Sequence, residues 1–149
     1  MGLMKYITSS IFVFLLFLTS CTSQKIMQAT IPFEIGNATS QQYMGGREES
    51  STGTELRIPL SFSNNIEIKV NKVYFRGKEA QAIIDTIENE KVLVVKMPNN
   101  LKESSEAINL KLNSDEAVIS YNENGETKYA KIQGIKQKQP LIYKSAPKI

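Results

Sequence analysis

Acid-base side chains in this sequence are few and poorly placed for catalysis. The chain of 149 residues contains no histidine, which is the side chain best suited to proton transfer near neutral pH and the commonest metal ligand. The adjacent carboxylates Glu48-Glu49 and Asp115-Glu116 lie in polar stretches typical of turns. We expect them to face water rather than to hold calcium or to cleave a glycoside. The sequence therefore predicts no catalytic residue, no metal site and no cofactor.

The single cysteine, Cys21, is the one residue whose chemistry the surrounding sequence supports. Lys5 provides a positive charge, residues 11–18 form an apolar run, and Thr19 and Ser20 are small. This order is typical of a secretory signal peptide. The apolar run is much shorter than the ~20 residues that a spanning helix needs, so we interpret it as the core of a removable leader.

The segment Leu18-Thr19-Ser20-Cys21 resembles the lipobox of bacterial lipoproteins. In that family the cysteine thiol receives a diacylglycerol, and the acylated cysteine becomes the first residue of the mature protein. The resemblance implies a signal peptide over residues 1–20 and a lipidated cysteine with a tether over residues 21–29. The remaining residues, 30–149, are enough for one domain, which we expect to be a β-domain from the strand pattern described below. Acyl chains such as palmitate would then hold the protein on a membrane.

Two further segments, Gln42-Tyr43-Met44-Gly45-Gly46 and Tyr74-Phe75-Arg76-Gly77-Lys78, resemble elements of small Bacteroidota lipoproteins. In such proteins a few acidic residues just after the cysteine direct the chain to the cell surface, and Thr22-Ser23-Gln24-Lys25 contains none. The resemblance implies an outer-membrane protein that faces the periplasm. Because those proteins have no agreed function, it implies no active-site residue.

Removal of the leader leaves a chain of nearly balanced charge and without a free thiol. The leader holds one of the 18 basic residues and none of the 15 acidic ones, so 17 basic residues remain against 15 acidic ones. With Cys21 lipidated, no disulfide can form, and stability must come from a packed core. We do not expect an exported chain with this charge balance to bind nucleic acid.

Alternating apolar residues predict β-strands in the rest of the chain. Leu56, Ile58 and Leu60 lie on one face of an expected strand over residues 54–62. Residues 66–70 repeat the alternation after Ser63-Asn64-Asn65, which predicts a hairpin with a three-residue turn. The alternation then slips by one at residues 71–72, which predicts a β-bulge or a crossing between sheets.

A second hairpin is predicted at Asn124-Gly125, the strongest short turn signal in the sequence. A two-residue turn there pairs residue 121 with 128, 119 with 130 and 117 with 132. Further strands are expected at residues 31–35, 41–44, 79–87, 91–97, 108–112 and 141–143, with 91–97 as the central one. About eight short strands predict an all-β fold. An antiparallel β-sandwich with an immunoglobulin-like outline is favoured, and a small β-barrel is the alternative.

Two surface segments are candidates for binding a partner. One is a polar loop, framed by Gly45, Gly46, Arg47 and Gly53. The other is a basic run, which we expect at a solvated sheet edge and which consists of Lys69, Lys72, Arg76 and Lys78.

These features favour a lipid-anchored, non-enzymatic module that binds a protein or another component of the cell envelope. Two alternatives stay open. One is an envelope hydrolase or carbohydrate-processing factor that uses Asp and Glu carboxylates, and the other is an immunity or inhibitor protein.

Overall fold

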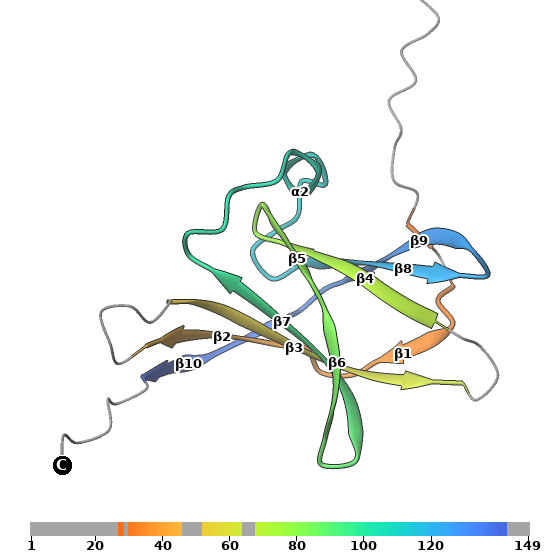
Figure 1. Cartoon of the computed structure of the whole chain (residues 1–149), viewed down its shortest axis with the longest axis horizontal. Coiled ribbons are helices and arrows are strands. Elements are labelled where there is room, and N and C mark those ends of the chain that lie inside the picture. The colour runs from red at the N-terminus through yellow and green to blue at the C-terminus, as the bar shows by residue number, and fades with distance from the viewer. Residues whose placement is uncertain (1–26, 29, 46–51, 64–67, 143–149) are drawn as a thin grey trace, which may run out of the picture.

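The computed structural model describes residues 27–28, 30–45, 52–63 and 68–142. The leader, Cys21, Gly46, Arg47 and Glu48-Glu49 lie outside these ranges. Within them, ten strands form two sheets that pack face to face (Figure 1). The predicted all-β sandwich is therefore confirmed. The alternative of a small barrel is wrong, because the two sheets do not close on each other.

The larger sheet has six strands in the order β10-β2-β3-β7-β6, with β1 paired to one end of β3. Its strands are β1 (Phe33–Ile35), β2 (Thr39–Met44), β3 (Gly53–Phe62), β6 (Ile83–Ile87), β7 (Glu90–Pro98) and β10 (Lys136–Ile142). The smaller sheet has the order β5-β4-β8-β9. Its strands are β4 (Ile68–Phe75), β5 (Lys78–Gln81), β8 (Ala117–Glu123) and β9 (Glu126–Ile132).

The path of the chain agrees with the immunoglobulin-like outline. In the larger sheet β2, β3, β7 and β6 take the places of strands A, B, E and D. In the smaller sheet β5, β4, β8 and β9 take those of C′, C, F and G. The strand β10 is an addition, which lies parallel to β2 at the edge of the larger sheet.

The core lies between the two inner faces, as the alternation along the strands dictates. Leu56 and Ile58 of β3 are fully buried, and so are Leu93 of β7 and Ile119 of β8. The apolar face predicted for residues 54–62 is therefore the face that meets the other sheet. Burial of these side chains supplies the stability that a chain without disulfides needs.

The hairpin between β8 and β9 forms in the predicted register. Tyr121 pairs with Lys128, and the pairs 119–130 and 117–132 follow. Asn124 and Gly125 both have positive φ, at 53° and 86°, as a type I′ turn requires.

The predicted slip at residues 71–72 is a β-bulge between β4 and β8. The register shifts between Val70 and Lys72. Ser120 of β8 fills the gap, because its hydroxyl accepts from the amide of Lys72 at 3.1 Å and donates to the carbonyl of the same residue at 3.2 Å. The bulge is thus held by a side chain that replaces the missing ladder bonds.

The predicted hairpin between residues 54–62 and 66–70 is wrong. β3 and β4 belong to different sheets, so Leu60 does not pair with Ile68. Both strands still turn their apolar residues to the core. Alternation assigns an apolar face to each strand, but two such faces can lie side by side or oppose each other across a core.

The strand predicted over residues 108–112 is also wrong. The chain there forms the short helix α2 (Ser105–Asn109), which begins after Ser104. The Ser104 hydroxyl accepts from the amide of Ala107 at 3.4 Å and so caps the helix. Leu110 and Leu112 are half-buried against Tyr74 and Val118 on the outer face of the smaller sheet. No helix in the described part of the chain has the length and apolar character to cross a membrane.

Two other predicted strands differ in extent from those observed. Residues 79–87 do form strand, but the chain leaves the smaller sheet at Ala82 and enters the larger one at β6. The strand expected at 141–143 begins at Lys136 and pairs with β2 in parallel. Pro140 is tolerated there because β10 is an edge strand, although the register shifts beside it.

The hydroxyl of Tyr121 leads to a prediction about stability. It is buried and has no hydrogen-bond partner among the described residues, and burial raises its pKa. We therefore expect Tyr121→Phe to stabilise the protein by about 1 kcal/mol, because phenylalanine removes an unsatisfied polar atom. The edge-on contact of the ring with Phe33, at a centroid distance of 5.1 Å, would remain. Urea denaturation measures the change, and a loss of stability would show that the hydroxyl is satisfied in solution.

Candidate functional site

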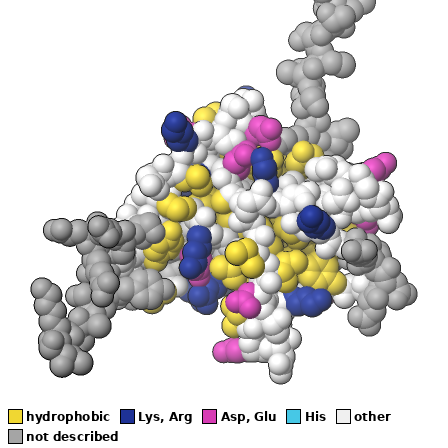
Figure 2. Space-filling model, viewed as in Figure 1, with side chains coloured by type: hydrophobic (Ala, Val, Ile, Leu, Met, Phe, Trp, Pro, Cys, Tyr) yellow, Lys and Arg dark blue, Asp and Glu magenta, His cyan; other side chains and the backbone are white. Residues whose placement is uncertain are grey.

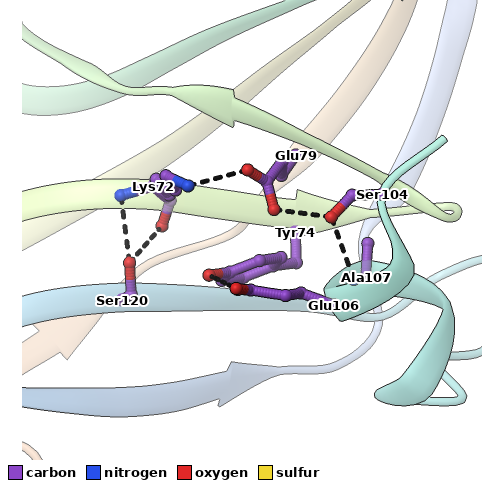
Figure 3. A network of polar contacts seen from close by, with 7 residues as sticks. All are labelled: Lys72, Tyr74, Glu79, Ser104, Glu106, Ala107 and Ser120. Atoms are coloured by element: carbon purple, nitrogen blue, oxygen red, sulfur yellow. Dashed lines mark hydrogen bonds and ion pairs between the residues drawn. The ribbon is translucent and has the colours of Figure 1, made fainter. Parts of the chain in front are cut away.

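A polar network joins α2 to the outer face of the smaller sheet (Figure 3). Lys72 of β4 donates to one carboxylate oxygen of Glu79 at 2.7 Å, and the hydroxyl of Ser104 donates to the other at 2.6 Å. The hydrogen bond from Lys72, followed by that from Ser104, lowers the pKa of Glu79. The bond to Glu79 in turn raises the pKa of Lys72. The two charges neutralise each other, and Ser104 links them to the helix that it caps.

A tyrosine lies beneath the same helix. Tyr74 is almost fully buried with Ala107 and Val118, and its hydroxyl donates to the carboxylate of Glu106 at 3.0 Å (Figure 3). An open hollow of about 410 Å³ adjoins it on the sheet, and polar side chains line much of this hollow, among them Asn71, Gln81, Ser120 and Thr127. The carboxylates of Glu79 and Glu106, through their bonds to Ser104 and Tyr74, hold α2 in place on the sheet.

The pair Asp115-Glu116 does not behave as the sequence predicted. Asp115 is exposed, but Glu116 is only 5% exposed. Its carboxylate accepts from the amide of Asn113 at 3.0 Å and from the side chain of Gln133 at 3.0 Å, and it pairs with Lys131 at 2.9 Å. The amide of Asn113 and the ammonium of Lys131 lower the pKa of Glu116 to about 2. The prediction of a solvated turn is therefore wrong for Glu116, which fixes the turn before β8.

This carboxylate should make stability depend on pH in the acid range. Its pKa is about 2 in the folded protein and near 4.5 in the unfolded chain. It therefore stabilises the fold above about pH 4.5 and loses that effect as the pH falls toward 2. We expect Glu116→Gln to destabilise the protein at pH 7 and to flatten the decline of stability between pH 4.5 and 2. Urea midpoints across this range test it, with Asp115→Asn as the exposed control. Parallel curves for wild type and Glu116→Gln would contradict the assignment.

Most of the basic run does not lie at the predicted sheet edge, since only Lys78 is on an outer strand, β5. Lys69 and Lys72 lie on β4, which is an inner strand between β5 and β8. Arg76 donates to the carbonyl of Ser114 at 3.0 Å and lies over the ring of Phe75 at 4.6 Å from its centre. Lys78 donates to the carbonyls of residues 98 and 99. Lys72, Arg76 and Lys78 thus serve contacts within the domain.

The predicted binding loop is described only at its two ends. Gly45 is half-buried just after β2, whereas Gly53 is buried as the first residue of β3, opposite Tyr43 and Pro98. A Cβ atom on Gly53 would lie 2.6 Å from the carbonyl oxygen of Met97. Gly53 therefore belongs to the sheet, where close backbone contact requires glycine, and the loop that it borders lies outside the described residues.

The most exposed large apolar side chain of the described residues, Ile83, was not predicted as part of a site. On β6, Ile83 is 71% exposed and Ile84 is 40% exposed. Two adjacent isoleucines before an aspartate are the only signal of it in the sequence, and they fit a buried strand equally well. Their exposure follows from the position of β6 at the end of the larger sheet.

No three His, Cys, Asp or Glu side chains within the described ranges lie close enough to hold a metal ion. Comparisons of this chain with protein-family models, curated proteins and solved structures gave no match. Its functional interpretation therefore depends on its own residues.

Proposed function

We propose that this protein is an exported lipoprotein whose β-sandwich binds a protein or another component of the cell envelope. The observation that carries the proposal is the order of Lys5, the apolar run of residues 11–18, and Leu18-Thr19-Ser20-Cys21. A short apolar leader that ends in small residues and a cysteine provides both export and a thiol for acylation. Two or more acyl chains give durable anchoring, since each buried methylene contributes ~0.8 kcal/mol.

The start of the described chain supports a domain held close to its anchor. The backbone of Met27 forms a parallel bridge with Tyr129 of β9, and the amide of Gln28 donates to the carbonyl of Tyr129 at 2.8 Å. Five residues separate Cys21 from Met27, so the six Cα–Cα steps between them can span at most about 22 Å. The β9 side of the sandwich then lies near the lipid. We further propose that this lipid is in the outer membrane and that the domain faces the periplasm.

The role of binding, rather than catalysis, is supported by how the described carboxylates are used. Glu116 fixes a turn through three partners, and Glu79 connects β5 to Lys72 and Ser104. Both carboxylates accept hydrogen bonds within structural networks, and these bonds lower the pKa of each. A sandwich with an exposed sheet edge is suited to recognising a partner by backbone hydrogen bonds.

Crosslinking in intact cells tests the proposal. The protein is treated with a gentle crosslinker, membranes are dissolved, and complexes are separated by size. We expect a discrete complex with a partner in fixed stoichiometry. Cys21→Ser serves as the control that lacks the acyl chains and should lose the complex. Recovery of the wild-type lipoprotein as an uncomplexed monomer would contradict a binding role.

A further inference from the structure

Apart from the three-residue β1, four strands end the two sheets, and three of these four are covered or blunted within the described residues. β9 is bridged at Tyr129 by Met27, and β5 is held to the end of β7 and the residue after it through Lys78, which donates to the carbonyls of Pro98 and Asn99. β10 carries Pro140 and two lysines, which discourage pairing with another strand. β6 has neither proline nor lysine, and four of its five residues are exposed. Among these edges, β6 is the one that is open to another strand.

The free hydrogen-bonding groups of β6 follow from its hairpin with β7. Glu88 and Asn89 form a two-residue turn with φ values of 52° and 67°, and Ile87 pairs with Glu90 beside it. In such a ladder alternate residues point their backbone groups at the partner strand, so Ile84 and Thr86 point theirs away from β7. The amide of Thr86 donates instead to the carboxylate of Asp85 at 2.8 Å. The free edge thus offers both backbone groups of Ile84 and the carbonyl of Thr86.

The charge on this hairpin indicates what kind of strand can pair with it. Asp85, Glu88 and Glu90 are all exposed. Figure 2 shows acidic side chains on the projecting hairpin at the bottom of the view, with hydrophobic side chains beside it. A second copy that paired antiparallel about the middle of β6 would place Asp85 opposite Asp85, and like charges directly opposite are destabilising. A basic side chain at that place would instead pair with the carboxylate.

We propose that β6 is the docking edge for an extended, lysine- or arginine-bearing segment of a partner protein. The segment adds to the larger sheet as an antiparallel strand, with apolar side chains against Ile83 and Ile84 and a basic side chain against Asp85. This inference rests on the proposed function, because it names the surface and the partner chemistry of the binding module. In Figure 1 the chain enters near β9 at the top, and the β6–β7 hairpin lies at the opposite end. The docking edge therefore lies on the side of the domain away from Met27, where the described chain begins.

A peptide of defined sequence tests the docking edge directly. The probe is acetyl-Thr-Lys-Val-Val-Thr-amide, which places its lysine opposite Asp85 and its valines opposite Ile84 and Ile83 in the antiparallel register. It is added at millimolar concentration to the purified full-length lipoprotein in detergent, and amide hydrogen exchange is followed by NMR. We expect exchange of the Ile84 amide to slow by about tenfold or more at saturation, because that amide gains a ladder hydrogen bond.

Two matched peptides separate strand addition from simple charge attraction. The first carries an N-methyl group on the valine opposite Ile84, which removes a backbone donor and should abolish the protection. The second has glutamate in place of lysine and should bind at least about threefold more weakly. Asp85→Asn in the protein should abolish the preference for lysine over glutamate.

Three outcomes would overturn the proposal. In the first, the peptide slows amide exchange at another edge such as β10 rather than at β6. In the second, the N-methyl peptide binds as tightly as the unmodified one. In the third, the Ile84 amide is protected without any peptide, and its protection rises with protein concentration. The last would mean that a second copy occupies the edge. The peptide experiment does not depend on acylation or on recovering a cellular partner. If the peptide does not bind, the docking edge is refuted but the proposed binding role stands. If the lipoprotein stays uncomplexed in crosslinked cells, the binding role itself is refuted.

Discussion

Replacing Cys21 with serine should abolish acylation and release the protein from its lipid anchor. The thiol is the attachment point for the acyl chains, and a serine hydroxyl is a far weaker nucleophile. Chains of about 16 carbons contribute ~0.8 kcal/mol for each methylene that they bury, so their removal eliminates the main source of membrane affinity. We expect incorporation of a labelled fatty acid to fall to background, and the protein to lose its lipid-dependent partition into a detergent phase.

Incorporation of the acyl label is a better readout than sedimentation with membranes. An uncleaved leader in the Cys21→Ser variant keeps the apolar run of residues 11–18, and this run binds membranes without any lipid. Ser20→Ala is the matched control. It keeps a small residue before the cysteine and should be labelled like the wild type. If Cys21→Ser incorporated as much label as Ser20→Ala, the lipid would be attached elsewhere and the assignment would be wrong.

Ile58→Ala should lower the free energy of unfolding by about 3 kcal/mol. Ile58 is fully buried in β3, where it pairs with Leu93 and faces the smaller sheet. Truncation removes apolar contacts and leaves a cavity that a close-packed core fills only in part. This would be a large share of the stability of a single domain.

Ile83→Ala provides the matched control, since it makes the same change in another strand of the same sheet. Ile83 is 71% exposed, so the substitution should change stability by no more than about 0.5 kcal/mol. Urea denaturation of both variants gives the comparison. Similar losses for the two would mean that residue 58 does not lie in the core, and the arrangement of the sheets would need revision.

The parts of the fold that the sequence predicted are those fixed by local chemistry. Asn124-Gly125 admits a tight type I′ turn, and such a turn sets the register of β8 and β9 for every following pair. The alternation at residues 54–62 likewise identified the buried face of β3. The neighbour of β3 was not predictable in this way, because the hydrophobic pattern is the same whether β4 lies beside it or across the core.

The parts that escaped prediction depend on residues distant in sequence. The burial of Glu116 needs Lys131 and Gln133, which arrive only when β9 returns along β8. The open edge at β6 exists because the chain changes sheets at Ala82, where the apolar period is ambiguous. The helix α2 was not predicted for two local reasons. The residues around its cap, Ser104, also fit a turn, and the three alternating apolar residues that follow favoured a strand. Local patterns therefore predict most of the strands, whereas the candidate site depends on contacts between residues distant in the sequence.

The mass of the first peptide of the mature protein tests the central claim most directly. The protein is purified from native cell membranes, digested, and analysed by mass spectrometry. A lipid-anchored module predicts that the chain begins at Cys21 and that this residue carries a diacylglycerol group. A chain that begins at Met1, or an internal Cys21 with a free thiol, would contradict it.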